Sequence, residues 1–526
     1  MECARNPLFV VTKTDKQTFI ASLTCSAFGY LYFAFNIIQN HDAIEFLYWD
    51  WTTKRTYTQG RWVEWLLYSI SGGLLTPWLS ILIAIIALAL CTVLIIRIFD
   101  VKDIISIIAI SACFSLNPFM ISSFIYTFMI DDFMIGLLFG ILGVYLVNCH
   151  KVWGLVAGSI LVSISMARYQ AFVCVIVAIL TIRLLQVLVQ GYTSNMNIIR
   201  LIIKYAIHVV GSMVLYLLIN RLVLLLTNTN MSEYRNLDTM GQIGISQLIG
   251  GIRPAYHAFI NYFEVTRILG GEIAYIAMIF ILLFVLISSL GLLIYRKNKS
   301  LLQILLVVII LFSLPILLNT IFFTGAGNIH LLMQHSLCFL LVCGVVLCRE
   351  LNIDGIKNLK PKFMQICTKM VVICAIFIAF RWGVIANETA TVLEMQNRNM
   401  YALCIRIVDR IEQYPDFDIR TTPVAIIIGY MEDKNSNYPV TKPYFAKYQQ
   451  LTGIFARDYA YIGHPKRTHD YIRDHIGFNY INKDYDLNAI TTSEEYQEIP
   501  TFPAKESLAI IDGVLVVKVS TSNFFN

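Results

Sequence analysis

Long apolar segments recur along most of this chain, and each is about the length that crosses a lipid bilayer. A transmembrane helix needs about 20 mostly apolar residues. Segments of this kind lie near residues 18–38, 77–98, 104–120, 133–148, 152–166, 171–190, 201–226, 271–295, 301–323, 331–348 and 367–386. The sequence therefore predicts a polytopic α-helical membrane protein with about eleven transmembrane helices.

Composition and charge fit a chain whose main solvent is the membrane. Only 14% of the residues are charged, against about 25% in soluble domains. The net charge of +6 does not indicate nucleic-acid binding, because Lys and Arg gather in short loops on one side of the predicted spans. This bias predicts a cytoplasmic N-terminus, and an odd number of spans then places the C-terminus outside. The 12 cysteines include no CxxC pair and mostly lie in apolar segments, where small packing residues are expected.

Two long loops are predicted on the outer side, at 39–76 and 227–270. In the first loop, Trp62, Trp65 and Leu66 share one helical face. Aromatic residues on such a face anchor helices at the membrane surface. The spacing therefore predicts an amphipathic helix lying in the membrane interface.

The second loop contains a similar segment, ISQLIGGIRPAYHAFINYFEVTRIL. Glycine and proline are the strongest local interruptions of a helix. We therefore expect an interfacial helix here that breaks at Gly250, Gly251 and Pro254.

The composition changes beyond the last predicted span. TPVAIIIGY reads as a strand, and SLAIIDGVLVVKVS reads as two strands around Asp512-Gly513, a strong hairpin signal. We expect residues 1–386 to form the membrane module and residues 387–526 to form a small extracytoplasmic α/β domain. No internal repeat is evident, which argues against a repeat-built transporter.

The polar stretch after the first span carries a candidate acid. Asn40, His41, Asp42 and Glu45 follow the apolar segment closely. One interpretation is a helix end followed by a hydrated loop. The other is that Asp42 lies at the lip of a cavity, where partial burial disfavours its charged form and makes it a better base toward a hydroxyl. The local sequence leaves both interpretations open.

Two adjacent acids, Asp131 and Asp132, lie among apolar residues at the predicted outer end of the fourth span. Acids at the edge of the hydrocarbon are costly unless they face a cavity or a partner. One of them can cap the helix, where negative charge suits the helix dipole. A second interpretation has one acid capping the helix and the other acting on a substrate.

Arg168 lies in a tight outer turn between two short apolar segments, next to Tyr169 and Gln170. It can extend its charge to the membrane surface while its methylenes stay in the apolar layer. Alternatively, its planar guanidinium binds an anionic group, because its donors match phosphate oxygens.

Arg61 lies in QGRW among Trp51, Trp62 and Trp65. Stacking of the arginine on a tryptophan is one explanation of this pattern. Contact with a phosphate or a sugar ring is the other.

The predicted outer turn TGAGNIHLLMQHS, residues 324–336, begins the tenth span. His330 and Gln334 are four residues apart and would share a helical face. His330 and His335 are five apart, which is poor spacing for a two-histidine metal site, so no metal is predicted. No Walker loop, Ser/His/Asp signature or HExxH motif is present. Acids, arginines and aromatic residues thus converge on one side, which suits a reaction between a lipid-anchored anion and a hydroxylated acceptor.

The order of these motifs resembles a known family. In chain order they are Asn40-His41-Asp42, Gly60-Arg61-Trp62, Asp131-Asp132 and Tyr169-Gln170-Ala171. Together with a long helical bundle and a small outer C-terminal domain, they resemble the bacterial serotype-converting glucosyltransferases that modify O-antigen and related surface polysaccharides. These enzymes belong to the GT-C superfamily, and the resemblance covers roughly residues 18–430.

The resemblance implies transfer of a hexose, usually glucose, from undecaprenyl phosphate to a polysaccharide hydroxyl at the outer face of the bacterial inner membrane. The reaction would be a single inverting displacement with Asp42 as the base. Asp131 or Asp132 would orient the acceptor or the sugar, and Arg61 and Arg168 would bind the phosphate. The other expected substrate contacts are Asn40, Trp62, Tyr169, Gln170 and His330.

The resemblance implies no cofactor and no essential metal, because phosphate is already a good leaving group. The implied partners are the lipid-linked donor, a lipid-linked or surface polysaccharide acceptor and membrane lipid. A flippase and a lipid-phosphate sugar synthase would be linked functionally.

Other functions remain open at the level of sequence. A transporter or lipid flippase would need charged residues near the bilayer midplane, where His208 is the main ionisable candidate. A polysaccharide polymerase would share the substrates and would depend on arginines in two large outer loops. Acids at the outer ends of helices favour the glycosyltransferase.

Overall fold

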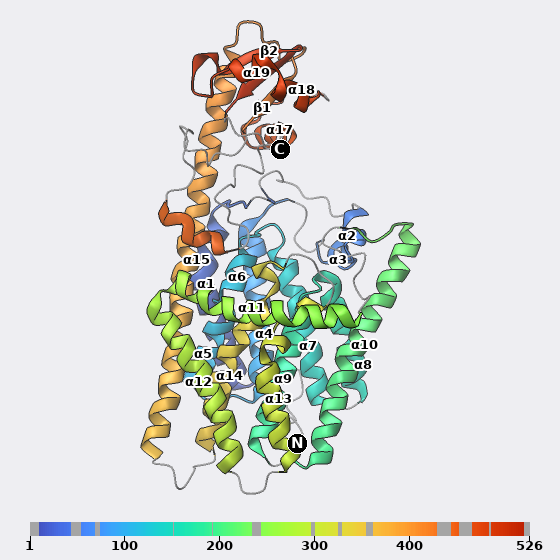
Figure 1. Cartoon of the computed structure of the whole chain (residues 1–526), viewed down its shortest axis with the longest axis vertical. Helices are drawn as coiled ribbons and strands as arrows, with labels where there is room; N and C mark the ends of the chain where they lie inside the picture. Colours follow the sequence, from blue (N-terminus) through green and yellow to red (C-terminus); the bar gives the residue numbers. More distant parts are fainter. Residues whose placement is uncertain are drawn as a thin grey trace.

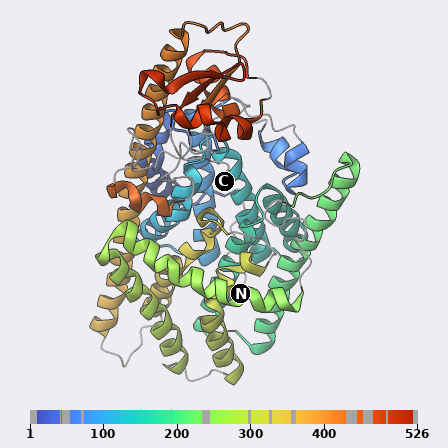
Figure 2. The same cartoon turned by 45° about the horizontal axis from the view of Figure 1, so that its top comes forward.

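The computed structural model describes residues 10–40, 42–43, 54–68, 74–150, 152–191, 193–233, 244–295, 300–323, 329–353, 361–428, 443–451, 465–482 and 485–519. Most of these residues are helical. The helices form an elongated bundle, and a small region with a β-sheet lies beyond one end of it (Figure 1). Turning the molecule brings this region forward over the end of the bundle (Figure 2).

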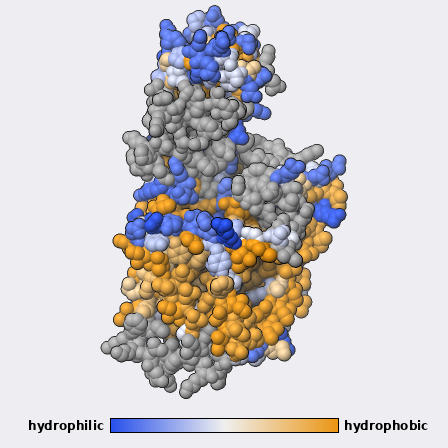
Figure 3. Space-filling model, in the orientation of Figure 1, coloured by the Kyte–Doolittle hydropathy of each residue, from blue (hydrophilic) through white to orange (hydrophobic). Residues whose placement is uncertain are grey.

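The helices of the bundle are α1 (Lys13–Phe35), α4 (Pro77–Phe99), α5 (Ile104–Ser115), α6 (Pro118–Phe124), α7 (Ile130–Cys149), α8 (Val152–Arg168), α9 (Phe172–Gln190), α10 (Asn195–Thr227), α11 (Ile245–Gly270), α12 (Glu272–Tyr295), α13 (Leu301–Leu317), α14 (Phe339–Ile353) and α15 (Pro361–Glu412). Among the described helices, seven are long and apolar enough to cross a membrane, or eight if the bent pair α5–α6 forms one span. Two more, α8 and α13, are apolar but shorter. Hydrophobic residues cover the lower part of the bundle, and hydrophilic residues cover the region of the sheet (Figure 3).

Local signals explain where several of these helices begin. Thr12 and Asp15 form a capping box at the start of α1. Side chains of Asp103, Asn117 and Ser194 accept backbone N–H groups at the starts of α5, α6 and α10. Such caps satisfy backbone donors that the first turn of a helix leaves without partners.

Glycines let α7 and α8 pack very closely. A Cβ on Gly143 would lie 2.7 Å from the carbonyl oxygen of Gly158, and one on Gly136 would lie 2.7 Å from Cγ of Arg168. Small residues at helix contacts allow backbones to approach in membranes. This contact brings the C-terminal end of α8 against the first turns of α7, and it thereby positions Arg168.

The second loop contains a helix, as predicted, but the predicted break in it is wrong. α11 runs without interruption from Ile245 to Gly270 and contains Pro254. It runs across the bundle rather than along it (Figure 1). Proline removes one backbone hydrogen bond, to the carbonyl of Gly250, and both residues are exposed, so water can replace that bond. Gly251 lets the helix approach the backbone of Phe322.

The long helix α15 joins the bundle to the sheet region. Its 52 residues combine the last predicted span with the amphipathic segment that follows, and the predicted domain boundary at 386/387 lies inside it. Residues up to Leu393 pack into the core of the bundle, whereas residues from Met400 onward pack into the core beside the sheet.

The sheet contains β1 (Val424–Ile427), β2 (Leu508–Ile511) and β3 (Val514–Lys518) in the order β1-β3-β2. β1 pairs in parallel with β3, and β2 pairs antiparallel with β3. The predicted hairpin is confirmed, because Asp512 and Gly513 both have positive φ, as a two-residue hairpin turn requires. The short helices α17 (Pro465–Tyr471), α18 (Leu487–Thr492) and α19 (Glu494–Glu498) accompany the sheet.

Candidate active site

A short loop between two small helices is pinned to the bundle at the end nearer the sheet. The helices are α2 (Lys54–Thr58) and α3 (Glu64–Tyr68). The side-chain amide of Gln170 donates to the carbonyl of Gln59 at 2.8 Å, and the hydroxyl of Tyr216 on α10 donates to the carbonyl of Gly60 at 3.1 Å. Gly60 has a φ of +72°. These contacts fix the backbone immediately before Arg61.

The predicted amphipathic helix in this loop is not found among the described residues. α2 and α3 have five residues each, and Trp62 lies in the turn between them. Trp65 and Leu66 on α3 are exposed, whereas Trp62 packs against the core of the bundle. The loop is held by hydrogen bonds from Gln170 and Tyr216 rather than by one apolar helical face.

Replacing Gly60 with alanine tests how firmly this loop is fixed. A Cβ there would lie 2.4 Å from the hydroxyl oxygen of Tyr216, and positive φ is costly for alanine. Gly271→Ala is the matched control, because Gly271 has a φ of +89° and no atom would lie within 4 Å of the new Cβ. We expect thermal unfolding in detergent to show a loss of about 1–3 kcal/mol for both variants, with a further loss at Gly60.

The variant Gly60→Ala/Tyr216→Phe removes the clashing hydroxyl oxygen. It should regain part of the stability that Gly60→Ala loses beyond the control. Equal losses for Gly60→Ala and Gly271→Ala would contradict the proposed packing of the loop against α10.

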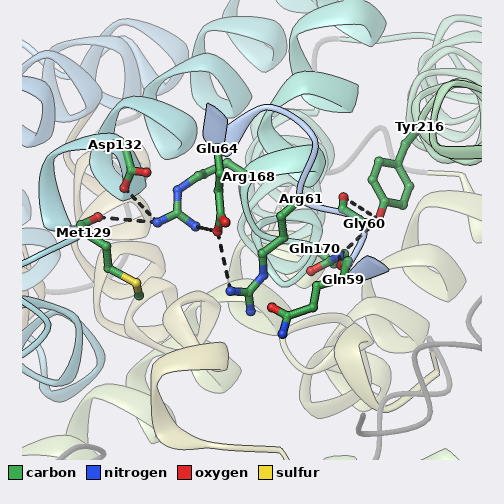
Figure 4. Close-up of polar contacts among 9 residues, drawn as sticks. All are labelled: Gln59, Gly60, Arg61, Glu64, Met129, Asp132, Arg168, Gln170 and Tyr216. Atoms are coloured by element: carbon green, nitrogen blue, oxygen red, sulfur yellow. Dashed lines mark hydrogen bonds and ion pairs between the residues drawn. The ribbon is translucent and has the colours of Figure 1, made fainter. Parts of the chain in front are cut away.

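Arg168 lies between two carboxylates at the centre of the site (Figure 4). Its Nη1 is 2.7 Å from Oε1 of Glu64, and its Nη2 is 2.7 Å from Oδ1 of Asp132. Nη2 also lies 3.5 Å from the carbonyl of Met129. The guanidinium therefore joins the loop carrying Glu64, the first turn of α7 and the end of α8. We call Arg61, Glu64, Asp132 and Arg168 the ion network.

Three of the four residues of the ion network are almost completely buried. Arg168 is 0% exposed, Glu64 1% and Asp132 2%. Two interpretations of the sequence are therefore wrong. Arg168 does not extend to the membrane surface, because it pairs with buried acids. Neither Asp131 nor Asp132 caps α7, because the cap position is Met129 and both acids lie in the first helical turn. Their negative charge suits that end of the helix dipole.

Arg61 is the more accessible arginine of the ion network. Its Nη1 lies 3.5 Å from Oε1 of Glu64, and its side chain is 25% exposed. Its guanidinium carbon lies 5.6 Å from the ring centroid of Tyr169. Among the described residues, the aromatic partner of Arg61 is therefore Tyr169 and not a tryptophan. Trp65 is 53% exposed, and Trp51 lies outside the described residues.

Asn40 shapes the turn that carries Asp42. Its Oδ1 accepts from the backbone N–H groups of Asp42 and Ala43 at 3.2 and 3.0 Å, and Asn40 is buried. The hydroxyl of Thr127, just before α7, donates to the carbonyl of Ile38 at 3.0 Å. The half-buried Asp42 therefore lies at the same end of the bundle as Asp131 and Asp132. His41 and Glu45 fall outside the described residues.

The predicted helical face of His330 and Gln334 is wrong. Residues Leu331–Met333 and His335–Cys338 form 3₁₀ helices, and the α-helix begins only at Phe339. Gln334 lies between the two short helices, and His330 is half-buried. His335 is buried and lies 2.9 Å from the hydroxyl of Ser123. Within the described ranges, no group of three or more His, Cys, Asp and Glu residues is placed to hold a metal.

Glu64 is the residue that the sequence analysis missed. It binds Arg168 directly and lies 3.5 Å from Arg61. Its position three residues after Arg61 was the available signal, because residues three apart on a helical turn are neighbours.

Comparison with known proteins identifies the family. Residues 31–334 match the family model described as glucosyl transferase GtrII. The match includes Asp42 and every residue of the ion network. Searches of curated proteins and of solved structures gave no match. Because the matched segment covers more than half of the 526 residues, this chain belongs to the GtrII family of glucosyltransferases.

Proposed function

We propose that this protein transfers glucose from undecaprenyl phosphate to a hydroxyl of a surface polysaccharide such as O-antigen, on the extracytoplasmic side of the bacterial inner membrane. The family implies glucosyl transfer to surface polysaccharide. One observation carries the choice of donor. Arg61 stays accessible beside the buried Glu64, at the end of an apolar bundle. A lipid-anchored phosphate can reach such a site from the membrane.

The proposed topology puts the N-terminus in the cytoplasm and the ion network outside. It uses about eleven spans, which include the two shorter apolar helices and α14. The region from 387 to 526 then lies outside as a small α/β domain. The asymmetry of Lys and Arg between the loops supports this orientation.

In the proposed reaction, the acceptor oxygen forms a bond to the anomeric carbon while the bond from that carbon to the phosphate oxygen breaks. Asp42 takes the proton of the acceptor hydroxyl. The undecaprenyl phosphate leaves with the electron pair, and Arg61 stabilises its charge. Asp131 or Asp132 orients the acceptor or the sugar. The configuration at the anomeric carbon inverts.

The ion network gives Arg168 a positioning role in this proposal. Both of its Nη atoms contact carboxylates. Its main role in this proposal is therefore to position the site, and not to bind phosphate. Glu64 connects Arg168 to Arg61, and it thereby sets the position of the proposed phosphate ligand. Tyr169 supports Arg61 from the other side.

A transfer assay tests the proposal. The purified protein, reconstituted in lipid nanodiscs, receives undecaprenyl-phosphate glucose and the acceptor polysaccharide. We expect glucose on the polysaccharide with inverted anomeric configuration, detected by NMR, and no transfer from a nucleotide-linked glucose. A flippase would leave the polysaccharide unchanged. Transfer from the nucleotide sugar alone would refute the lipid donor.

A further inference from the structure

A groove lies far from the ion network, near the N-terminal end of α1. Its volume is about 600 Å³, and it is bounded by α1, α4 and α7, all of which are apolar enough to span a membrane. The walls are formed by Phe19, Ile20, Val93, Leu94, Leu138 and Leu142. Tyr145, near the polar end of the groove, is about 20 Å along α7 from Asp132 at 1.5 Å per residue.

The groove opens toward the membrane. Of the residues that line it, Ile20 is 62% exposed and Leu90 is 40% exposed, whereas Leu94 is buried. An apolar surface of this kind within a bilayer contacts hydrocarbon chains rather than water. Its volume lies in the range of pockets that hold small ligands, about 300–1,000 Å³.

Charged residues close one end of the groove. Arg97 donates to both carboxylate oxygens of Asp15 at 2.8 and 2.7 Å, and it also donates to the carbonyl of Val10 at 2.8 Å. The hydroxyl of Thr12 donates to the same carboxylate at 2.7 Å. The Arg97–Asp15 pair is neutral overall. It forms a polar floor where the apolar walls end.

Lys16 adds a positive charge at the same end. It is exposed and lines the groove, and its ammonium makes no ion pair within the part of the chain that the structure describes. An apolar channel that ends at an exposed cation beside a neutral polar floor matches a lipid with a hydrocarbon chain and an anionic headgroup.

We propose that this groove binds one anionic phospholipid. An acyl chain occupies the space between α1, α4 and α7, and the phosphate contacts Lys16. The site is separate from the donor site, because it lies at the other end of the same helices. With the proposed topology, it faces the cytoplasmic leaflet, where anionic lipids attract basic residues.

Native mass spectrometry of the full-length, delipidated protein tests this proposal. The protein receives equal amounts of phosphatidylglycerol and phosphatidylcholine. We expect the anionic lipid to be retained about fivefold more, since a lysine near an anionic membrane surface contributes about 1 kcal/mol. Lys16→Gln should bring the ratio close to one. Lys102→Gln is the matched control, because Lys102 is a cation at the same end that pairs with Asp100 and does not line the groove.

A second pair of variants tests the groove itself. Leu142→Trp fills the groove and should remove the retained lipid. Leu218→Trp, on the exposed surface of α10, should leave it bound. Equal retention of the two phospholipids by the wild type, or an unchanged ratio in Lys16→Gln, would overturn the proposal. Displacement of phosphatidylglycerol by an equal amount of undecaprenyl phosphate would overturn the assignment to a phospholipid.

Discussion

Asp42→Asn is expected to lower the rate of glucosyl transfer by about 10²–10⁴-fold, the usual contribution of a positioned general base. Asparagine keeps the size of the side chain but cannot take the proton of the acceptor hydroxyl. The turn should remain intact, because Asn40 holds it through the backbone N–H groups of residues 42 and 43. Initial rates at saturating donor and acceptor measure the effect.

Glu233→Gln is the control for Asp42→Asn. Glu233 is an exposed acid in the other long loop that the proposed topology places outside, and its loss should leave the rate unchanged. The loss at Asp42 should appear in kcat with little change in KM, because the base acts in the transition state. A normal rate for Asp42→Asn would exclude this residue as the base.

Arg168→Met is expected to lower the free energy of unfolding by about 3–5 kcal/mol, the usual cost of removing one partner from a buried ion pair. Methionine is apolar, so it leaves Glu64 and Asp132 buried without their shared cation. Arg168→Lys should be intermediate, because one ammonium cannot reproduce the planar fork that contacts both acids. Thermal unfolding in detergent measures the stability of the wild type, Arg168→Met and Arg168→Lys.

The variant Arg168→Met/Glu64→Gln/Asp132→Asn separates stability from activity. It removes all three charges, so the stability should largely return, because neither Glu64 nor Asp132 is left as a buried charge without Arg168. Transfer should stay low, because Arg61 loses the carboxylate that positions it and Asp132, a candidate for orienting the substrate, loses its charge. An unfolding temperature of Arg168→Met equal to that of the wild type would contradict the structural role of the ion network.

The sequence predicts several of the apolar helices and the hairpin, because each depends on local signals. Span length follows from bilayer thickness, and Asp512-Gly513 can adopt the positive φ values that a tight turn needs. The course of α11 could not be predicted, because it depends on whether water can replace one hydrogen bond at Pro254. The joining of two segments into α15 also depends on tertiary packing, since each half packs into a different core.

The sequence found most of the residues at the candidate site but not their pairing. Arg61, Asp132 and Arg168 were identified separately, and no local rule links residues 36 or 104 positions apart, as Arg168 is from Asp132 and Glu64. The pairing follows from the glycine contacts between α7 and α8 and from the bonds that hold the loop at Gly60. The catalytic and binding roles of these residues stay predictions for the transfer assay.

Because α15 is continuous, the number of residues between the two cores sets the rotation of the sheet relative to the bundle. An α-helix turns by about 100° per residue, and one core ends at Leu393 while the next begins at Met400. One residue added or removed between them would turn the whole sheet region by about 100° around the helix axis. The face that this region turns toward the bundle is therefore set by helical phase, and this short stretch should tolerate substitutions more readily than changes in length.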